Sequence, residues 1–123
     1  MLDHITLAVK DYPKAKAFFA AALAPLGYEV VMELGAFCGL GAKKKPDLWL
    51  AGEDAEHRVA PMHVAFQAED RKAVDAFHAA ALAAGARDNG KPGLRPDYHP
   101  TYYGAFVLDA DGHNIEVVCH RPA

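Results

Sequence analysis

Two short stretches of the sequence alternate apolar and polar residues with the two-residue period of a half-buried β-strand. Leu2–Val9 places aliphatic side chains at every second position and His4 on the opposite face. Met62–Ala68 repeats this pattern, with His63 again on the face opposite the large apolar residues. The sequence therefore predicts two strands, each with a histidine near its start on the more polar face.

These two stretches belong to a longer internal repeat. Moving the sequence along itself by 59 positions places His4 on His63 and Asp11 on Asp70. Two alanine-rich runs then coincide without a gap, Ala20–Ala24 and Ala79–Ala83. We therefore expect one domain, 1–123, that is built from two similar modules at about residues 1–52 and 61–120.

Each predicted strand is followed by a helix. Asp11 and Asp70 stand where the side chain of a helix N-cap is needed. Apolar side chains at helical spacing predict a buried stripe on each helix: Phe18, Leu23, Phe77 and Leu82. In the first module, three strand-like segments follow: Tyr28–Leu34, Phe37–Gly41 and Asp47–Leu50.

The second module is less regular after its helix. Arg87–Thr101 contains an Asn-Gly turn and three prolines, so it is either a long loop or a short strand followed by a loop. Tyr103–Leu108 and Asn114–Cys119, joined by a turn at Asp109–Gly112, predict a hairpin. Each module is thus expected to be a βαβββ unit.

Composition and charge narrow the class of protein. The apolar fraction of 52% and the charged fraction of 24% are typical of a soluble globular domain. The formal net charge is −3, and Lys43–Lys45 is the longest basic run, so no nucleic-acid partner is expected. No apolar run is long enough for a membrane span, and no signal peptide is evident, so we expect a cytoplasmic protein.

The histidine-led repeat and the final hairpin, Asp109–Glu116, resemble the vicinal oxygen chelate superfamily, which includes glyoxalases, bleomycin-resistance proteins and extradiol dioxygenases. The resemblance covers essentially the whole chain. It implies an α+β fold in which two βαβββ modules form a curved mixed sheet around a cavity, with the helices outside. It also implies a small-molecule substrate and a divalent metal.

Three metal ligands follow from this resemblance: His4, His63 and Glu116. Each lies on the polar face of its predicted strand. Two imidazoles and one carboxylate suit Fe(II), Mn(II), Ni(II) or Zn(II) and leave coordination positions open. A substrate with two adjacent oxygens could bind there, with the metal acting as Lewis acid and template. The residue-by-residue alternative is that each of these side chains only forms hydrogen bonds or meets solvent.

One residue departs from the pattern of glyoxalase I. Aligning the last strands of the two modules makes Trp49 the equivalent of Glu116 in the repeat. Glyoxalase I has a fourth metal ligand at this position of the first module. An indole cannot bind a metal. The set of two histidines and one glutamate is closer to extradiol dioxygenases and to manganese-dependent fosfomycin-resistance transferases. We expect Trp49 to line the cavity and to contact substrate.

The loop before the final hairpin supplies further candidates. We predict catalytic roles for Tyr102 and Tyr103, beside Glu116, and substrate binding by Arg95 and His99. Two functions remain open at this point. One is a metal-dependent lyase, dioxygenase or transferase of the vicinal oxygen chelate type. The other is a metal-free protein that binds a drug or metabolite. In either case a homodimer is expected, because the sheet leaves strand edges to be covered.

Overall fold

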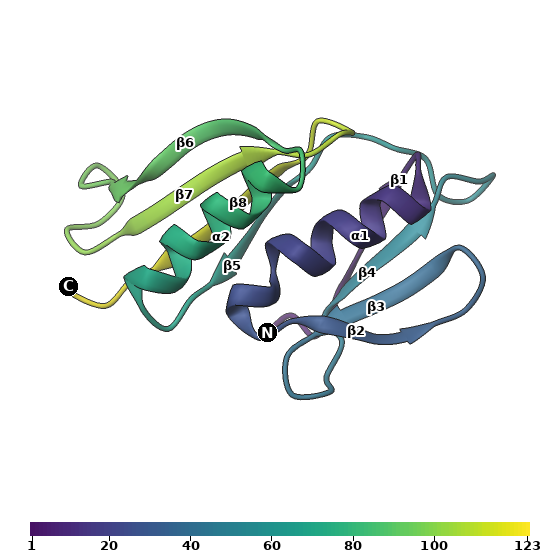
Figure 1. The fold of residues 1–123 in the computed structure, drawn as a ribbon, viewed down its shortest axis with the longest axis horizontal. Helices are drawn as coiled ribbons and strands as arrows, with labels where there is room; N and C mark the ends of the chain where they lie inside the picture. The colour runs from purple at the N-terminus through teal and green to yellow at the C-terminus, as the bar shows by residue number, and fades with distance from the viewer. The chain divides into compact units, whose positions relative to one another are not determined.

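The computed structural model describes residues 1–123 and divides into two compact units, Met1–Ala60 and Pro61–Ala123. Each unit is one βαβββ module. This confirms the predicted α+β fold of two βαβββ modules, each with a mixed sheet and a helix on one face of it (Figure 1).

The first module contains two helical segments and four strands. In chain order these are β1 (Ile5–Val9), α1 (Tyr12–Ala22), the 3₁₀ segment η1 (Ala24–Leu26), β2 (Glu29–Glu33), β3 (Phe37–Gly41) and β4 (Leu48–Gly52). Helix α1 begins at its predicted cap, because the Asp11 side chain accepts a hydrogen bond from the Lys14 backbone N–H at 3.2 Å. Gly27, with a φ of 81°, ends η1 in the left-handed conformation that glycine tolerates best.

The second module has the same order with one helix. Its elements are β5 (His63–Gln67), α2 (Arg71–Ala83), β6 (Arg87–Leu94), β7 (Tyr103–Leu108) and β8 (Asn114–Cys119). The Asp70 side chain caps α2 by accepting the Ala73 N–H at 2.8 Å. Strand β6 covers the first part of Arg87–Thr101 and a loop covers the rest, which is the second of the two predicted alternatives. Strand β6 is an edge strand, which explains how it tolerates Pro92.

The two sheets have the same topology. The strand orders are β1-β4-β3-β2 and β5-β8-β7-β6, and in each sheet only the first pair is parallel. In the parallel pairs, Thr6 lies beside Trp49 and Ala65 lies beside Glu116. The registers confirm the alignment of the repeat, so Trp49 and Glu116 occupy equivalent positions of the two sheets.

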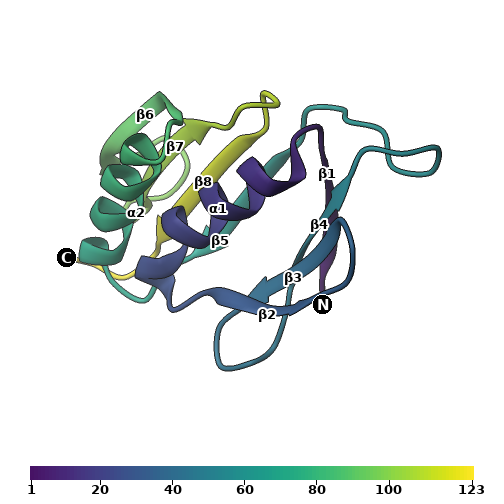
Figure 2. The same cartoon turned by 45° about the vertical axis from the view of Figure 1, so that its right-hand side comes forward.

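Each module has its own core between its helix and one face of its sheet (Figure 2). Of the four predicted core residues on the helices, Phe18, Leu23 and Phe77 are buried, but Leu82 is 39% exposed. The expectation for Leu82 was therefore wrong, because α2 packs on β6, β7 and β8 through a narrower stripe that includes Val74 and Ala81. Both cysteines are buried and unpaired.

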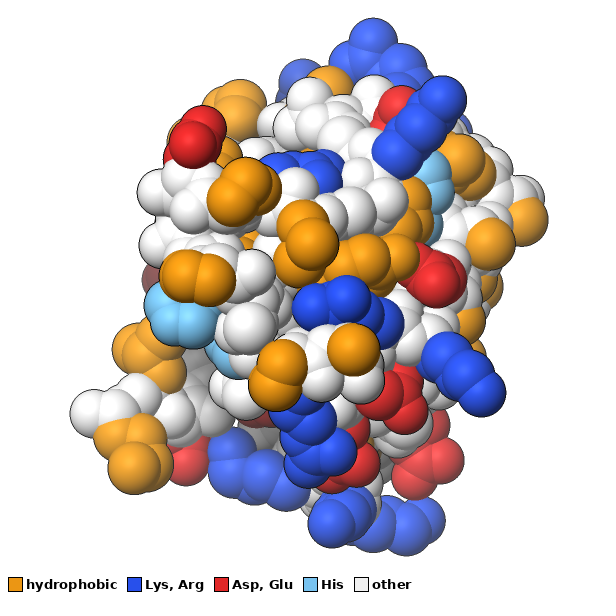
Figure 3. All heavy atoms as spheres, turned by 90° about the vertical axis from the view of Figure 1, so that its left-hand side faces the viewer, with side chains coloured by type: hydrophobic (Ala, Val, Ile, Leu, Met, Phe, Trp, Pro, Cys, Tyr) orange, Lys and Arg blue, Asp and Glu red, His pale blue; other side chains and the backbone are white.

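No helix of the structure is both long and apolar enough to cross a membrane. On the face of the molecule shown in Figure 3, basic and acidic side chains are interspersed with apolar ones. That face therefore carries no large patch of a single charge.

Candidate metal and ligand site

The carboxylate of Glu116 is the most buried acidic group of the second module. Its side chain is 2% exposed, and its two oxygens have different partners. Nε2 of His63 lies 2.8 Å from Oε1, and the hydroxyl of Tyr102 donates a hydrogen bond to Oε2. His63 is 54% exposed, so one side of this group is open. The structure thus brings together three of the predicted site residues.

Strand geometry explains this grouping. In β8, Glu116 alternates with Ile115 and Val117, which are buried against the helix side of the sheet. On β7, Gly104 pairs with Val118 of β8, and a Cβ atom at Gly104 would lie 3.4 Å from Oε2 of Glu116 and 3.2 Å from the Tyr102 ring. The missing side chain at Gly104 leaves space for the phenol to reach the carboxylate.

Tyr102 is held in place by aromatic contacts. Its ring makes edge-to-face contacts with Tyr98, at a centroid distance of 5.1 Å, and with His120, at 5.3 Å. Burial and the hydrogen bond to Glu116 raise the pKa of Tyr102 above its ordinary value. The phenol is therefore protonated at neutral pH and acts as a hydrogen-bond donor to the carboxylate.

Tyr103 is not part of this group. Its hydroxyl donates a hydrogen bond to Asp75 of α2 at 2.7 Å, and the Arg71 guanidinium lies 4.9 Å from the centre of its ring. Consecutive strand residues point to opposite faces, so Tyr102 and Tyr103 cannot both face Glu116. The predicted pair of catalytic tyrosines is thus separated, with Tyr103 on the helix side of the sheet.

Arg95 and His99 lie in the segment that precedes Tyr102. The Arg95 guanidinium is 5.5 Å from the ring centre of Phe106, the residue directly opposite Glu116 in the β7–β8 pair. It donates to the Lys91 carbonyl at 2.7 Å, which fixes its position. His99 is exposed, and its Nδ1 is 3.1 Å from the Thr101 hydroxyl. Arg95 thus adds a cation to the Glu116 face of the sheet.

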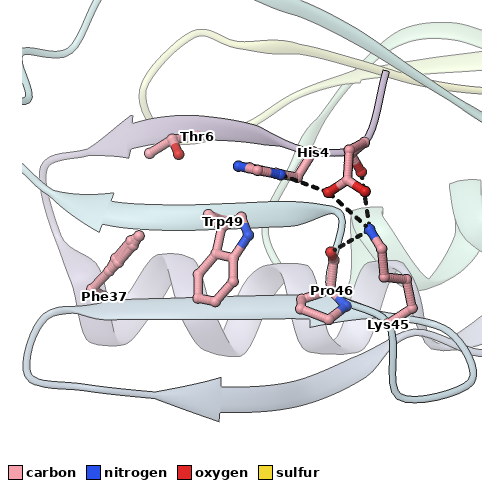
Figure 4. A pocket seen from close by; sticks show the side chains of 7 residues that line it. His4, Thr6, Phe37, Lys45, Pro46 and Trp49 are labelled. Atoms are coloured by element: carbon pink, nitrogen blue, oxygen red, sulfur yellow. Dashed lines mark hydrogen bonds and ion pairs between the residues drawn. The ribbon is translucent and has the colours of Figure 1, made fainter. Parts of the chain in front are cut away.

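His4 lies in the first module and has a carboxylate partner of its own. Its Nδ1 is 2.7 Å from Oδ1 of Asp3, and Figure 4 shows the other ring nitrogen directed away from Asp3. The hydrogen bonds from His4 and Lys45 lower the pKa of the Asp3 carboxyl. An ionised Asp3 favours the His4 tautomer with its proton on Nδ1, which leaves the Nε2 lone pair available to a metal.

Trp49 lies in the same pocket as His4. The pocket has a volume of about 440 Å³ and is lined by Asp3, His4, Thr6, Phe37, Lys45, Pro46 and Trp49 (Figure 4). Leu48 and Leu50, on either side of Trp49 in the sequence, are fully buried on the helix side of the sheet. The predicted alternation along β4 is therefore confirmed, and the indole faces the pocket.

A second group of ligand-type side chains lies in the final hairpin turn. One atom from each of Asp109, Asp111 and His113 lies within 4.8 Å of the others, close enough for one cation. Oδ1 of Asp109, however, accepts the backbone N–H groups of Asp111 and His113 at 3.0 and 2.8 Å. Nδ1 of His113 accepts the Met62 N–H at 3.0 Å, so its proton is on Nε2. These contacts account for the group as a structural turn.

The sequence matches the profile of the Glyoxalase/Bleomycin resistance protein/Dioxygenase superfamily over residues 1–117. The chain belongs to this superfamily. Its members bind small-molecule ligands and commonly use divalent metals. A search of curated protein sequences finds no match to this chain.

Solved structures of the superfamily share the fold. A glyoxalase/bleomycin resistance protein from Albidiferax ferrireducens has a TM-score of 0.84 at 24% identity, with 97% of this chain and 98% of that one covered. A family enzyme from Burkholderia phytofirmans gives 0.73 at 17% identity, with 97% and 98% covered. The fosfomycin resistance protein FosX from Listeria monocytogenes gives 0.70 at 22%, with 98% and 93% covered. At these identities the likeness establishes the fold alone.

The structure shows contacts of several side chains that the sequence did not single out. Asp3, which orients His4, had a signal in its position next to a candidate ligand. The ring centre of Phe37 lies 5.0 Å from that of Trp49, and no signal in the sequence indicated this contact. His113 follows the hairpin turn in the sequence, yet it is fully buried. His78 showed no partner in the sequence, yet it is buried and lies 2.9 Å from Asp88.

Proposed function

We propose that this protein is a metal-dependent enzyme that acts on a small molecule with two adjacent oxygen atoms. The observation that carries this proposal is the environment of Glu116. A buried carboxylate faces an imidazole through one oxygen and a protonated phenol through the other. An imidazole with a carboxylate is a donor set that suits Fe(II), Mn(II), Ni(II) or Zn(II).

The residues proposed as metal ligands are His63, Glu116 and His4. The first two belong to one module and are already in contact. The third follows from the resemblance to the superfamily, and it comes from the same chain or from a second copy. Its Nε2 is suited to the role because Nδ1 is hydrogen-bonded to Asp3. A divalent ion held by these groups would polarise the oxygens of a chelating substrate.

The remaining chemistry is assigned to residues beside Glu116. Tyr102 keeps its proton and fixes Oε2, which leaves Oε1, the oxygen beside His63, as the proposed metal ligand. We propose that Tyr102 acts by positioning Glu116, since a phenol that has a raised pKa and already donates to a carboxylate is a poor acid. Arg95 is proposed to attract an anionic or oxygen-rich substrate, and His99 to bind it at the edge of the site. Tyr103 is left out, since its hydroxyl donates to Asp75 of α2, on the helix side of the sheet and away from Glu116.

The second candidate function is metal-free binding of a drug or metabolite. The aromatic wall of the first module favours it, because Trp49 and Phe37 offer a flat surface to a ligand without any metal. The two functions differ in one measurable property. The enzyme requires a transition metal, whereas the binding protein does not.

The test is elemental analysis of protein purified without chelators. We expect about one transition metal per chain, with the loss of that metal in His4→Ala, His63→Ala and Glu116→Ala, because two ligands hold a labile ion poorly. His57→Ala is the control for losing a histidine elsewhere. Asp111→Asn tests the hairpin turn: loss of metal in this variant alone would place the ion there. Unchanged metal content in Glu116→Ala would overturn the proposed site.

A further inference from the structure

One wall of the pocket in the first module is formed by two aromatic side chains and a proline. The ring centres of Phe37 and Trp49 are 5.0 Å apart with an interplanar angle of 34°, and Pro46 lies beside the indole. In Figure 4 these side chains follow one another from left to right, along the direction of the strands. We call Phe37, Trp49 and Pro46 the aromatic platform.

The platform is fixed by the backbone beneath it. Gly39 pairs with Trp49 across β3 and β4, and a Cβ atom there would lie 2.9 Å from the indole and from Pro46. The indole therefore lies flat over a position without a side chain. Phe37 also contacts the edge of His57, with ring centres 6.5 Å apart. A surface held in this way is preorganised, so a ligand does not have to order it on binding.

The ionisable groups of the pocket lie toward the Pro46 end of the platform, whereas Thr6 lies toward the Phe37 end. His4, Asp3 and Lys45 form a connected set there, in which Lys45 Nζ is 3.2 Å from Oδ1 of Asp3. The negative charge of Asp3 is thus met by Lys45 and His4, and Nε2 of His4 is left to interact with a ligand. An apolar ring would face the platform while oxygens would face His4.

We propose that the natural ligand of this pocket carries a planar aromatic ring that stacks on Trp49 and Phe37, joined to an oxygen-bearing group that is directed at His4. The role of the oxygens as metal ligands rests on the proposed function. The stacking does not, since it needs only the platform. Two aromatic side chains select a flat ring over a puckered one of similar area, because only the flat ring can contact the indole over its whole face.

The test compares two matched neutral diols, 1-phenyl-1,2-ethanediol and 1-cyclohexyl-1,2-ethanediol. They share the two adjacent oxygens and differ in the ring. The chain has a single tryptophan, so the indole N–H of Trp49 gives one signal in a ¹H–¹⁵N spectrum. We expect the phenyl compound to shift this signal saturably and to bind about three- to tenfold more tightly than the cyclohexyl compound. Equal affinities, or no binding of either diol, would overturn the proposal.

Variants then assign the preference to the platform. Trp49→Leu should reduce the phenyl-to-cyclohexyl affinity ratio to about one, measured by calorimetry, whereas Trp49→Phe should retain most of it. Met32→Ala changes an exposed apolar residue of β2 outside the pocket and serves as the control. A ratio that survives Trp49→Leu would show that the ring binds elsewhere.

Running both titrations in EDTA-treated and Zn(II)-loaded protein separates this inference from the proposed function. A phenyl preference in protein that binds no metal would leave the platform standing while the metal-dependent function fails. Tight Zn(II) binding without any phenyl preference would overturn the stacking proposal and leave the metal-dependent function standing.

Discussion

The hydroxyl of Tyr102 donates a hydrogen bond to Oε2 of Glu116, a carboxylate that is buried in the second module. A buried carboxylate without partners would be costly, so this bond both stabilises the group and fixes its orientation. The other oxygen then faces His63 alone. Outer partners of this kind set the affinity of a metal site without touching the ion.

Replacing Tyr102 by Phe should weaken metal binding without unfolding the protein. The ring contacts remain in Tyr102→Phe, but Oε2 of Glu116 loses its donor. We expect Kd for Zn(II) or Mn(II) to rise by about tenfold or more, as measured by competition with a chromophoric chelator. Tyr98→Phe is the control, since Tyr98 is 65% exposed and contacts Tyr102 through its ring. An unchanged affinity in Tyr102→Phe would remove the phenol from the site.

Asp3 should act on metal binding through His4. Asp3→Asn removes the charge that holds the His4 proton on Nδ1, so the tautomer with a free Nε2 is less favoured. Because the Asp3 side chain is 70% exposed, we expect the smaller end of such effects, about a tenfold rise in Kd. The same chelator competition measures it. Asp97→Asn, at an exposed carboxylate of the second module, should leave Kd unchanged.

The positions of Trp49 and Glu116 could be predicted because strand alternation and the internal repeat are properties of local sequence. A two-residue period fixes which side chains share a face, and the repeat transfers that assignment from one module to the other. The pairing of Thr6 with Trp49 and of Ala65 with Glu116 follows from this register. Alternation and the repeat therefore predicted the strands and their faces, whereas the grouping of His63 with Glu116 was implied by the resemblance to the superfamily.

Contacts between segments that are distant in sequence could not be predicted. His113 follows a turn, where side chains are often exposed, but the turn closes against the start of β5 and the His113 ring accepts the Met62 N–H. His78 meets Asp88 only because α2 packs on β6. Neither contact has a local periodicity that would reveal it. For the same reason, the sequence predicted that Trp49 lines a pocket but did not predict its contact with Phe37.

The expected homodimer remains a prediction. Each four-stranded sheet has two edge strands, and the edge strand β5 has three exposed residues on one face, His63, Ala65 and Gln67. Unpaired edges of this kind favour association of two copies. Light scattering at micromolar concentration should give twice the 13.2 kDa mass of one chain. A mass of one chain under these conditions would contradict the dimer.

The contact between the buried His78 and Asp88 should make the stability of the protein depend on acid. Nε2 of His78 lies 2.9 Å from Oδ1 of Asp88, and this hydrogen bond, together with one from the Gly90 N–H, lowers the pKa of Asp88 below its ordinary 3.8. A carboxyl with a lower pKa in the folded state stabilises that state at pH values above its unfolded pKa. This contribution is lost as the pH falls through the lower folded value.

Asp88→Asn isolates this charge, because the amide oxygen can still accept both hydrogen bonds. Urea unfolding between about pH 2.5 and pH 6 should show the unmodified protein to be the more stable of the two at the upper end of the range. The difference in the free energy of unfolding should shrink as the pH drops below the ordinary pKa of Asp. Asp97→Asn, in the exposed loop after β6, controls for the general effect of removing one negative charge. A difference between Asp88→Asn and the unmodified protein that stays constant with pH would mean that folding does not lower the pKa of Asp88, because only a shifted pKa couples the stability to acid.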